Sequence, residues 1–243
     1  MMLYLGDCLN VLKTVKADSV AMVFADPPYF LSNGGKSIRS GRIVSVNKGE
    51  WDRPENYQDP AAFTYNWIKA CYDVLAEDGT IWISGTHHNL IATENALRRC
   101  GFKFINAVIW HKDDPPPLIY KTKFRFSYET ILWYEKGKNH HFDYDQMYSL
   151  GKCEMEDVWT LPAVSLEEKR YGYHPTQKPE VLLERIILAS TSPGDLVLDP
   201  FLGSGTTCAV AKRLGRKFIG IEKDKQFFDL ASRRIAAVEA PRQ

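Results

Sequence analysis

Residues 196–207 read LVLDPFLGSGTT, and this stretch decides the fold class. An apolar run leads into a turn that contains Gly203 and Gly205, a helical pattern covers 208–214, and a second apolar run covers 217–222. This order predicts strand, turn, helix and strand, which is the repeating unit of an open α/β sheet. Because glycine has no side chain, a ligand can approach the backbone closely where the helix begins.

The end of this unit indicates the kind of ligand. Glu222 lies 19 residues after Gly203, a spacing at which a carboxylate typically binds ribose hydroxyls. A nicotinamide cofactor is the obvious competitor, but Cys208 stands where the G-x-G-x-x-G fingerprint has its third glycine. The turn also lacks the lysine of a Walker-type phosphate loop. We therefore predict S-adenosylmethionine, which offers ribose and adenine without a phosphate.

A second informative stretch, Asp26-Pro27-Pro28-Tyr29, closes the apolar run 20–25. The prolines remove backbone donors and fix the chain direction, so the Asp26 carboxylate and the Pro27 carbonyl can both point into a cleft as acceptors. Two acceptors beside an aromatic ring suit a planar exocyclic amine. An ordinary strand-to-loop turn with a helix-capping aspartate explains these four residues equally well on their own.

The remaining strands of the sheet must come from the N-terminal half, because one helical stretch, 226–238, is all that follows Glu222. Apolar patterns in that half predict strands at 3–5, 20–25, 80–83 and 104–110 and a helix at 89–100. We expect one doubly wound, mostly parallel sheet whose chain starts in its middle, with the catalytic half first and the cofactor half last.

With these motifs the chain resembles the permuted, or beta-group, amino DNA methyltransferases, in which D-P-P-Y precedes F-x-G-x-G. Residues 26–29 and 201–205 match those two motifs. Residues 174–179, HPTQKP, look like the family segment that leads a helix into the cofactor strand, and residues 6–9, GDCL, resemble its cofactor-adenine segment. The resemblance implies a circularly permuted, Rossmann-like methyltransferase fold as a single domain over 1–243, with small DNA-facing insertions.

A closer resemblance involves residues 24–35, FADPPYFLSNGG, and 50–52, EWD. These look like the second adenine methyltransferase of GATC-specific restriction-modification systems, a type that accepts single-stranded as well as duplex DNA. This implies methylation of adenine N6. Cytosine-N4 methylation needs the same acceptors, although the cytosine group often carries Ser where this chain has Asp26. A non-catalytic nucleic-acid-binding subunit and a protein or RNA substrate are further alternatives.

The resemblance also implies roles for individual residues. In the catalytic set, Asp26, Pro27, Pro28 and Tyr29, the first two accept the amino hydrogens and Tyr29 stacks on the extruded base. Glu222 binds ribose, Asp7 lies at the adenine amino group, Thr176 and Lys178 hold the methionine carboxylate, and Phe201 flanks the purine or the sulfonium. The full predicted cofactor set is Asp7, Cys8, Thr176, Lys178, Asp199, Phe201, Gly203, Ser204, Gly205, Thr206, Glu222 and Lys223. For Asp199 a turn-capping role is nearly as good, and for His174 we favour a structural one.

Charge is distributed unevenly along the chain, although 31 basic and 30 acidic residues leave a net charge of only +1. Residues 98–141 carry nine Lys and Arg against four acids, and residues 34–53 carry five against two. We predict that these segments contact the DNA backbone, through Lys36, Arg39, Arg42, Lys121, Lys123 and Arg125. We interpret 32–55 as a mobile DNA-facing loop and 138–172 as a target-recognition insertion. Its acidic part, 143–168, departs from the family pattern and suits a partner protein equally well.

Composition fits a globular enzyme, since 243 residues with 44% hydrophobic side chains can form one domain with a large core. The sequence contains no apolar run of the roughly 18 to 20 residues that a membrane span needs, and we expect a cytoplasmic protein whose substrate lies in the bacterial nucleoid. Five cysteines without a C-x-x-C pair indicate neither a disulfide framework nor a zinc site. We expect no metal and, from the family resemblance, a homodimer.

Overall fold

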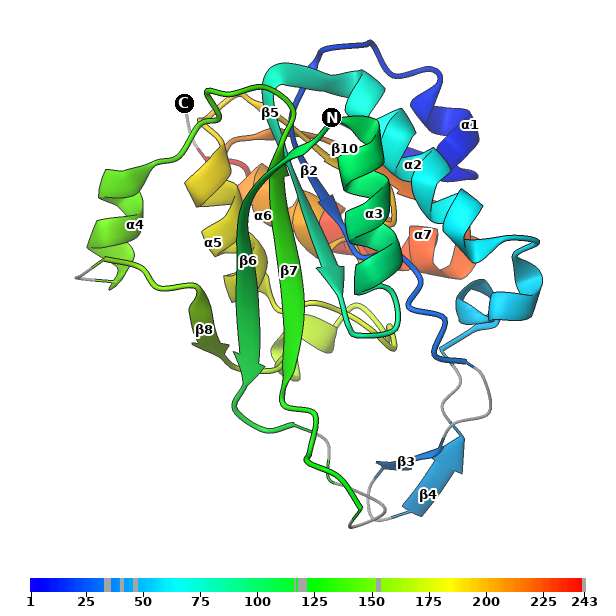
Figure 1. The fold of residues 1–243 in the computed structure, drawn as a ribbon. Coiled ribbons are helices and arrows are strands. Elements are labelled where there is room, and N and C mark those ends of the chain that lie inside the picture. The colour runs from blue at the N-terminus through cyan, green and yellow to red at the C-terminus, as the bar shows by residue number, and fades with distance from the viewer. Residues whose placement is uncertain are drawn as a thin grey trace.

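The computed structural model describes residues 1–32, 36–39, 42–45, 48–115, 117, 122–151 and 154–241, with the backbone alone for 36–39 and 42–45. Its main feature is an eight-stranded sheet with helices on both faces (Figure 1). The strands are β1 (Met2–Leu5), β2 (Val20–Ala25), β5 (Leu75–Gly85), β6 (Lys103–Lys112), β7 (Tyr128–Glu135), β8 (Val158–Leu161), β9 (Leu196–Asp199) and β10 (Lys217–Glu222). A separate hairpin pairs β3 (Lys36–Arg39) with β4 (Arg42–Ser45).

The helices follow the expected alternation with strands. They are α1 (Cys8–Leu12), α2 (Pro60–Val74), α3 (Leu90–Cys100), α4 (Tyr144–Gly151), α5 (Glu180–Ser190), α6 (Thr206–Arg213) and α7 (Lys225–Ala236), with short 3₁₀ turns at Glu50–Asp52, Pro54–Asn56 and Glu167–Lys169. Aspartate side chains cap the N-termini of α1, α2 and α7, because Asp7, Asp59 and Asp224 accept from backbone N–H groups at the start of these helices. The predicted helices at 89–100, 208–214 and 226–238 are thus confirmed within a few residues.

The sheet order is β1-β10-β9-β2-β5-β7-β6-β8. Parallel pairing joins β1 to β10, β10 to β9, β9 to β2 and β2 to β5, while β7 runs antiparallel to both β5 and β6. This confirms the predicted mostly parallel, doubly wound sheet. The expectation that the chain starts in the middle was wrong, because β1 is the edge strand beside β10 and the central position belongs to β2.

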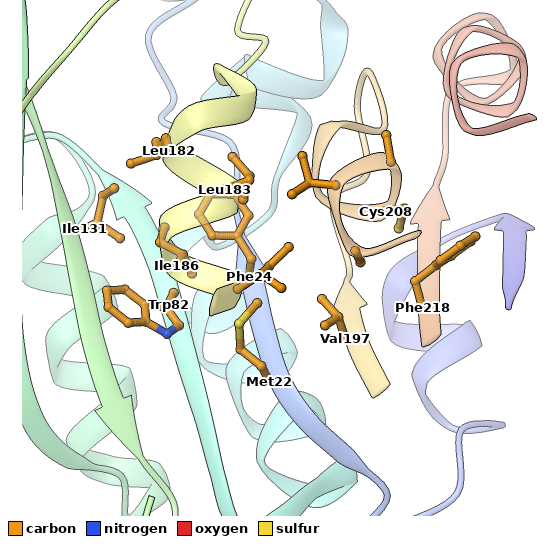
Figure 2. Packing of buried hydrophobic residues seen from close by; sticks show 14 of the residues in the cluster. Met22, Phe24, Trp82, Ile131, Leu182, Leu183, Ile186, Val197, Cys208 and Phe218 are labelled. Atoms are coloured by element: carbon orange, nitrogen blue, oxygen red, sulfur yellow. The ribbon is translucent and has the colours of Figure 1, made fainter. Parts of the chain in front are cut away.

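Alternating residues of β2 build two cores, one on each face of the sheet. Met22 and Phe24 pack with Leu182, Leu183 and Ile186 of α5 on one face, together with Trp82 and Ile131 from β5 and β7 (Figure 2). Val23 and Ala25 pack on the opposite face with residues of α2 and α3 that include Trp67, Ile68 and Leu97. Burial on both faces explains why β2 is continuously apolar instead of alternating with polar residues.

Two strands depart from the sequence analysis. The strand predicted at 104–110 is β6, but it does not pair with β5, because β7 lies between them. β7 was not predicted. Its residues Thr130–Tyr134 are all buried, so the run lacks the alternation that marks a half-exposed strand.

The two predicted insertions take different forms. Within 138–172, β8 pairs with β6 and completes the main sheet, and α4 lies to one side of it (Figure 1). The segment is therefore partly built into the sheet, and its role in target recognition stays a prediction. Within 32–55, the β3–β4 hairpin extends from the end of the sheet at which β2 and β5 finish (Figure 1), and its mobility and DNA contact also stay predictions.

In the portions of the chain that the structure describes, no helix is both long and apolar enough to cross a membrane. The same portions contain no group of three or more His, Cys, Asp or Glu side chains that could hold a metal ion. Cys8, Cys71, Cys100 and Cys208 are buried free thiols, and Cys153 lies outside the described residues.

Candidate active site

A pocket lies at the carboxyl ends of the central strands, where ligands bind in open α/β sheets. Its lining includes Asp26 and Pro28, which follow β2, and Gly203 and Glu222 from the cofactor half. The pocket has about 900 Å³ of empty space, part of it open to solvent. The early Asp-Pro-Pro-Tyr turn and the late glycine turn therefore meet in one cavity.

Asp26 is held by two side chains on the catalytic side of this pocket. Lys178 Nζ donates to Asp26 Oδ2 at 2.6 Å, and the Tyr29 hydroxyl donates to Asp26 Oδ1 at 2.7 Å. Tyr29 is buried, and its hydroxyl also lies 2.6 Å from Ser84 Oγ at the end of β5. The carboxylate orientation is thus fixed before any substrate binds, while each oxygen keeps a lone pair for a further donor.

Glu129 of β7 is the second largely buried carboxylate of this cluster, with 13% of its side chain exposed. Its Oε1 accepts from Lys112 at 2.5 Å, and its Oε2 lies 3.5 Å from Lys178 Nζ and 3.2 Å from both the Tyr29 and the Ser84 hydroxyl oxygens. Burial would raise the pKa of Glu129, but Lys178 and Lys112 outweigh it and lower that pKa to about 2. The cluster contains two carboxylates and two ammonium groups, so its charges balance.

Burial has a different outcome at Asp26. It raises the pKa of Asp26 above its ordinary value, Lys178 opposes the rise, and the neighbouring Glu129 adds to it. Burial would lower the pKa of Lys178, but Asp26 and Glu129 raise it, so the ammonium stays charged. Asp26 is consequently more basic than an exposed aspartate, which suits a hydrogen-bond acceptor for an amine.

Asp52 clamps the chain immediately after the Asp-Pro-Pro turn. Its Oδ1 accepts from the backbone N–H groups of Tyr29 and Phe30 at 3.0 and 2.8 Å. Its Oδ2 accepts from the N–H groups of Leu31 and Ser32 at 3.1 and 3.0 Å, and from Ser32 Oγ at 2.9 Å. Asp52 is only 1% exposed. Its carboxylate therefore satisfies four consecutive backbone donors and fixes the chain where it leaves the catalytic turn.

The cofactor half is organised around Glu222 at the end of β10. Its two oxygens accept from the N–H groups of Gly203 and Asp224, each at 2.8 Å, and each oxygen keeps a lone pair. Gly203 has φ +51, and a Cβ there would lie 3.1 Å from the His174 ring. Both the backbone conformation and the close approach of the imidazole therefore favour glycine at this position.

Aromatic rings form much of the pocket wall. Phe201 makes edge contacts with Trp67 and Phe63, with ring centroids 5.1 and 6.3 Å apart. His174 stacks on Trp51 at 6.2 Å and meets Phe227 edge-on at 4.3 Å. Burial, with Lys178 and Lys48 adding to it, lowers the pKa of His174 to about 3, so its ring is neutral and packs as an aromatic group.

The charges that line the pocket indicate what it can bind. Four carboxyl groups, Asp7, Asp26, Asp199 and Glu222, face two lysines, of which Lys178 is already paired with Asp26. Such a lining disfavours a phosphate and suits a nucleoside that carries a positive charge. With an aromatic wall for a purine and carboxylates for ribose hydroxyls, the residues present fit S-adenosylmethionine.

Most predicted cofactor residues lie in this pocket: Asp7, Cys8, Thr176, Lys178, Asp199, Phe201, Gly203, Ser204, Thr206, Glu222 and Lys223 all line it. Gly205 instead forms the cap of α6 with φ +79. Asp199 accepts from Phe201 N at 3.0 Å, and burial raises its pKa to about 7. Burial and the charge of Asp7 raise the pKa of Cys8 to about 12, so its thiol is not a nucleophile.

The predicted DNA-contacting residues are more scattered. Lys123 and Arg125 are exposed in the connection between β6 and β7. Lys36, Arg39 and Arg42 lie on the β3–β4 hairpin, of which the structure describes the backbone alone. Lys121 lies outside the described residues. The basic segment 98–141 does not form one surface, because Lys103 and Lys136 lie at the opposite end of β6 and β7, where they bond to backbone carbonyls.

Several residues of the pocket and of the cluster around Asp26 could not be assigned a role from the sequence: Trp51, Asp52, Tyr57, Phe63, Ser84, Lys112, Glu129 and Phe227. Glu129 had a weak signal, because it is one of two acids that border the run 130–134. The pairing of β7 with β5 brings it to Ser84, and the turn after β2 brings Tyr29 to it.

An open α/β sheet with an acidic, aromatic-walled nucleoside pocket beside an Asp-Pro-Pro-Tyr turn defines a class, the nucleoside-dependent transferases that act on amines. The profile of the DNA methylase family for N6 and N4 amino groups matches residues 20–233. The chain therefore belongs to this DNA methylase family.

Relatives of known type cover almost the whole chain. Type II methyltransferase M2.DpnII of Streptococcus pneumoniae is 48% identical over 242 residues, which span 98% of this chain and 90% of that protein. Type II methyltransferase M2.MboI of Moraxella bovis is 46% identical over 235 residues, which span 96% of this chain and 86% of that protein.

Solved structures share the fold. The M1.HpyAVI–SAM complex superposes with a TM-score of 0.69 at 25% identity, covering 96% of this chain and 98% of that one. The cytosine-N4-specific PvuII DNA methyltransferase gives a TM-score of 0.78 at 21% identity, covering 96% and 85%. At that identity the second likeness concerns the fold alone.

Proposed function

We propose that this protein transfers a methyl group from S-adenosylmethionine to the N6 amino group of adenine in DNA, within GATC and on single-stranded as well as duplex substrates. The observation that carries the proposal is that Asp26 lines the same pocket as Gly203 and Glu222. The choice of adenine over cytosine rests on an aspartate at position 26. The choice of GATC, and a place in a restriction-modification system, rest on the resemblance of residues 24–35 and 50–52 and on the Type II relatives.

The catalytic side of the pocket supplies hydrogen-bond acceptors. An adenine amino group is a poor nucleophile, because its lone pair is delocalised into the ring. Asp26 and the Pro27 carbonyl accept its two hydrogens, which favours a tetrahedral nitrogen with an available lone pair. Tyr29 and Lys178 hold the Asp26 carboxylate in position for this task, and Glu129 contacts both of them.

The opposite side of the pocket holds the cofactor. The free lone pairs of Glu222 would accept the ribose hydroxyls, Asp7 would accept from the adenine amino group, and Phe201 would provide an aromatic wall. When bound, S-adenosylmethionine supplies an electrophilic methyl group on a sulfonium cation. For Lys178 and Thr176 we retain the methionine carboxylate as a proposed contact, which Lys178 makes while sharing its ammonium with Asp26.

The test is incubation with tritiated cofactor and oligonucleotides that contain or lack GATC, each as a single strand and as a duplex, followed by mass spectrometry of the nucleosides. Label in N6-methyladenine from the GATC oligonucleotides supports the proposal. Label in N4-methylcytosine would replace adenine by cytosine, and label in neither nucleoside would refute DNA methylation.

A variant separates catalysis from binding. Asp26→Ala removes the acceptor that the proposal assigns to the amine, so methyl transfer should fall by at least about 100-fold. Cofactor affinity, measured by calorimetry, should stay within severalfold. Full activity of the purified variant would refute the assignment of Asp26.

We also propose that the protein forms a homodimer, which rests on the family resemblance. Light scattering after size-exclusion chromatography at micromolar concentration tests this. A mass that corresponds to one chain of 27.8 kDa would contradict it.

A further inference from the structure

Exposed aromatic rings gather in the connection that leads into β7. Phe124 is 96% exposed, Phe126 55% and Tyr128 54%. His87, from the loop after β5, stacks on Phe126 with ring centroids 5.0 Å apart and an angle of 15° between the rings. We call these four residues the aromatic surface. Rings that are this exposed contribute little to the core, and a group of exposed apolar side chains commonly marks a binding site.

Positive charge is interleaved with these rings. Lys123 Nζ lies 4.8 Å from the centre of the Phe126 ring, and Arg125 is exposed between Phe124 and Phe126. Residues 122–128 contain no acid. Alternating cations and exposed rings match the chemistry of a nucleic-acid strand whose bases are unstacked, because phosphates pair with the cations and bases stack on the rings.

The aromatic surface lies next to the catalytic cluster, because the ends of β5 and β7 lead to residues of both. Tyr128 directly precedes Glu129, and His87 follows Ser84 by three positions. Ser84 Oγ and Glu129 Oε2 are 3.2 Å apart, so the two segments that carry the rings diverge from one point beside Tyr29. A strand that delivers a base to Asp26 would pass close to this surface.

We propose that the aromatic surface stacks on unpaired bases of the DNA strand that flank the target nucleotide. The inference rests on the proposed DNA substrate and extends it, because it assigns a binding surface to residues that the methyl-transfer chemistry does not use. Phe124 and Phe126 provide stacking area, and Lys123 and Arg125 provide contacts to phosphates.

The test measures equilibrium binding of a fluorescein-labelled single-stranded 16-mer that contains GATC, without methyl transfer. Phe124→Ala combined with Phe126→Ala should weaken binding by about 10-fold or more, as expected when bases lose aromatic partners. Phe126→Trp should retain affinity, because any flat ring can stack. Phe104→Ala is the matched control, since Phe104 is 54% exposed but lies near the opposite end of the sheet beside Tyr134.

Salt dependence separates stacking from charge. Lys123→Ala combined with Arg125→Ala should reduce the slope of log affinity against log salt by about 1.4 for two lost phosphate contacts on a single strand. The phenylalanine variants should leave that slope unchanged. Unchanged affinity in the double phenylalanine variant, or an equal loss with a blunt duplex of the same sequence, would overturn the proposal.

The same wild-type and variant proteins distinguish a failure of this inference from a failure of the proposed function. If the wild-type protein methylates the oligonucleotide but the double phenylalanine variant has the same KM for it, the aromatic surface is refuted and DNA methylation stands. If the wild-type protein labels no DNA and binds the single strand no better than the variant, both are refuted. Thermal unfolding and cofactor affinity of each variant should match the wild type.

Discussion

Lys178 Nζ lies 2.6 Å from Asp26 Oδ2, although 152 positions separate the two residues in the sequence. The ammonium that the family resemblance assigns to the methionine carboxylate thus also contacts the proposed acceptor of the target amine. Its further acceptors are Glu129 Oε2 at 3.5 Å and the Thr176 carbonyl at 3.4 Å. One cation therefore links the cofactor side of the pocket to the catalytic side.

Lys178→Met should destabilise the fold by about 3–5 kcal/mol, because it leaves Asp26 buried without its charge partner. Urea unfolding at pH 7.5 measures this. Lys69→Met is the control, since Lys69 pairs with Asp73 on the exposed face of α2, where a pair is worth about 1 kcal/mol or less. Equal losses in the two variants would show that the Asp26 pair contributes no more than a surface pair.

Glu129→Gln should move the acid limb of the kcat profile to lower pH. Glu129 raises the pKa of Asp26 by its negative charge, so its neutral isostere lowers that pKa, and Asp26 stays ionised further into acid. Maximal kcat should also fall, by up to about 100-fold, if the Asp26 carboxylate shifts by about 1 Å. Glu135→Gln, near the opposite end of β7, should leave the acid limb in place, and an unmoved limb in Glu129→Gln would contradict this role.

Asp52→Asn should impair both stability and activity. An amide offers one acceptor oxygen where the carboxylate offers two, so donors among residues 29–32 lose their partner. Each buried donor left without an acceptor costs about 1–3 kcal/mol. Asp59→Asn provides the comparison, because asparagine caps a helix as well as aspartate does and Asp59 caps α2. Wild-type kcat in Asp52→Asn would show that the clamp is not needed for turnover.

Gly203→Ala should weaken cofactor binding in addition to straining the backbone. At φ +51 an alanine costs about 1–2 kcal/mol, and its Cβ would press on the His174 ring from 3.1 Å. Gly194→Ala isolates the backbone contribution, since Gly194 has φ +92 and a Cβ added there would have no atom of the described residues within 4 Å. Calorimetry with S-adenosylmethionine should show a higher Kd for Gly203→Ala alone. Equal Kd values would place His174 outside the binding site.

The sequence predicted the parts of the fold whose signals are local. The unit at 196–222 has an apolar period, a glycine turn and a terminal acid, and it forms β9, α6 and β10 as expected. β7 was missed because a continuous apolar run does not by itself distinguish a strand from a buried helix, and its antiparallel position depends on neighbours far along the chain. β2 has a run of the same kind, but the Asp-Pro-Pro-Tyr turn marks its end. The edge position of β1 has the same origin, since four apolar or aromatic residues carry no information on their partner.

The residues of the site likewise divide into those that could be predicted from the sequence and those that could not. Residues in compact motifs, such as Asp26 and Gly203, could be assigned from spacing and resemblance. Asp52 and Glu129 could not, because each acts through contacts across 20 to 100 residues of sequence with backbone or side chains of other elements. The pairing of Lys178 with Asp26 was not expected for the same reason.

The pairing of Leu5 with Glu222 joins the first strand of the sheet to the last one in chain order. During synthesis β1 cannot pair with β10 until residues 217–222 have left the ribosome, and Asp7 and Glu222 then border the same pocket. Contacts of such long range also form slowly, because a large loop must close first. A chain interrupted before Glu222 therefore lacks the strand and the carboxylate that complete this pocket.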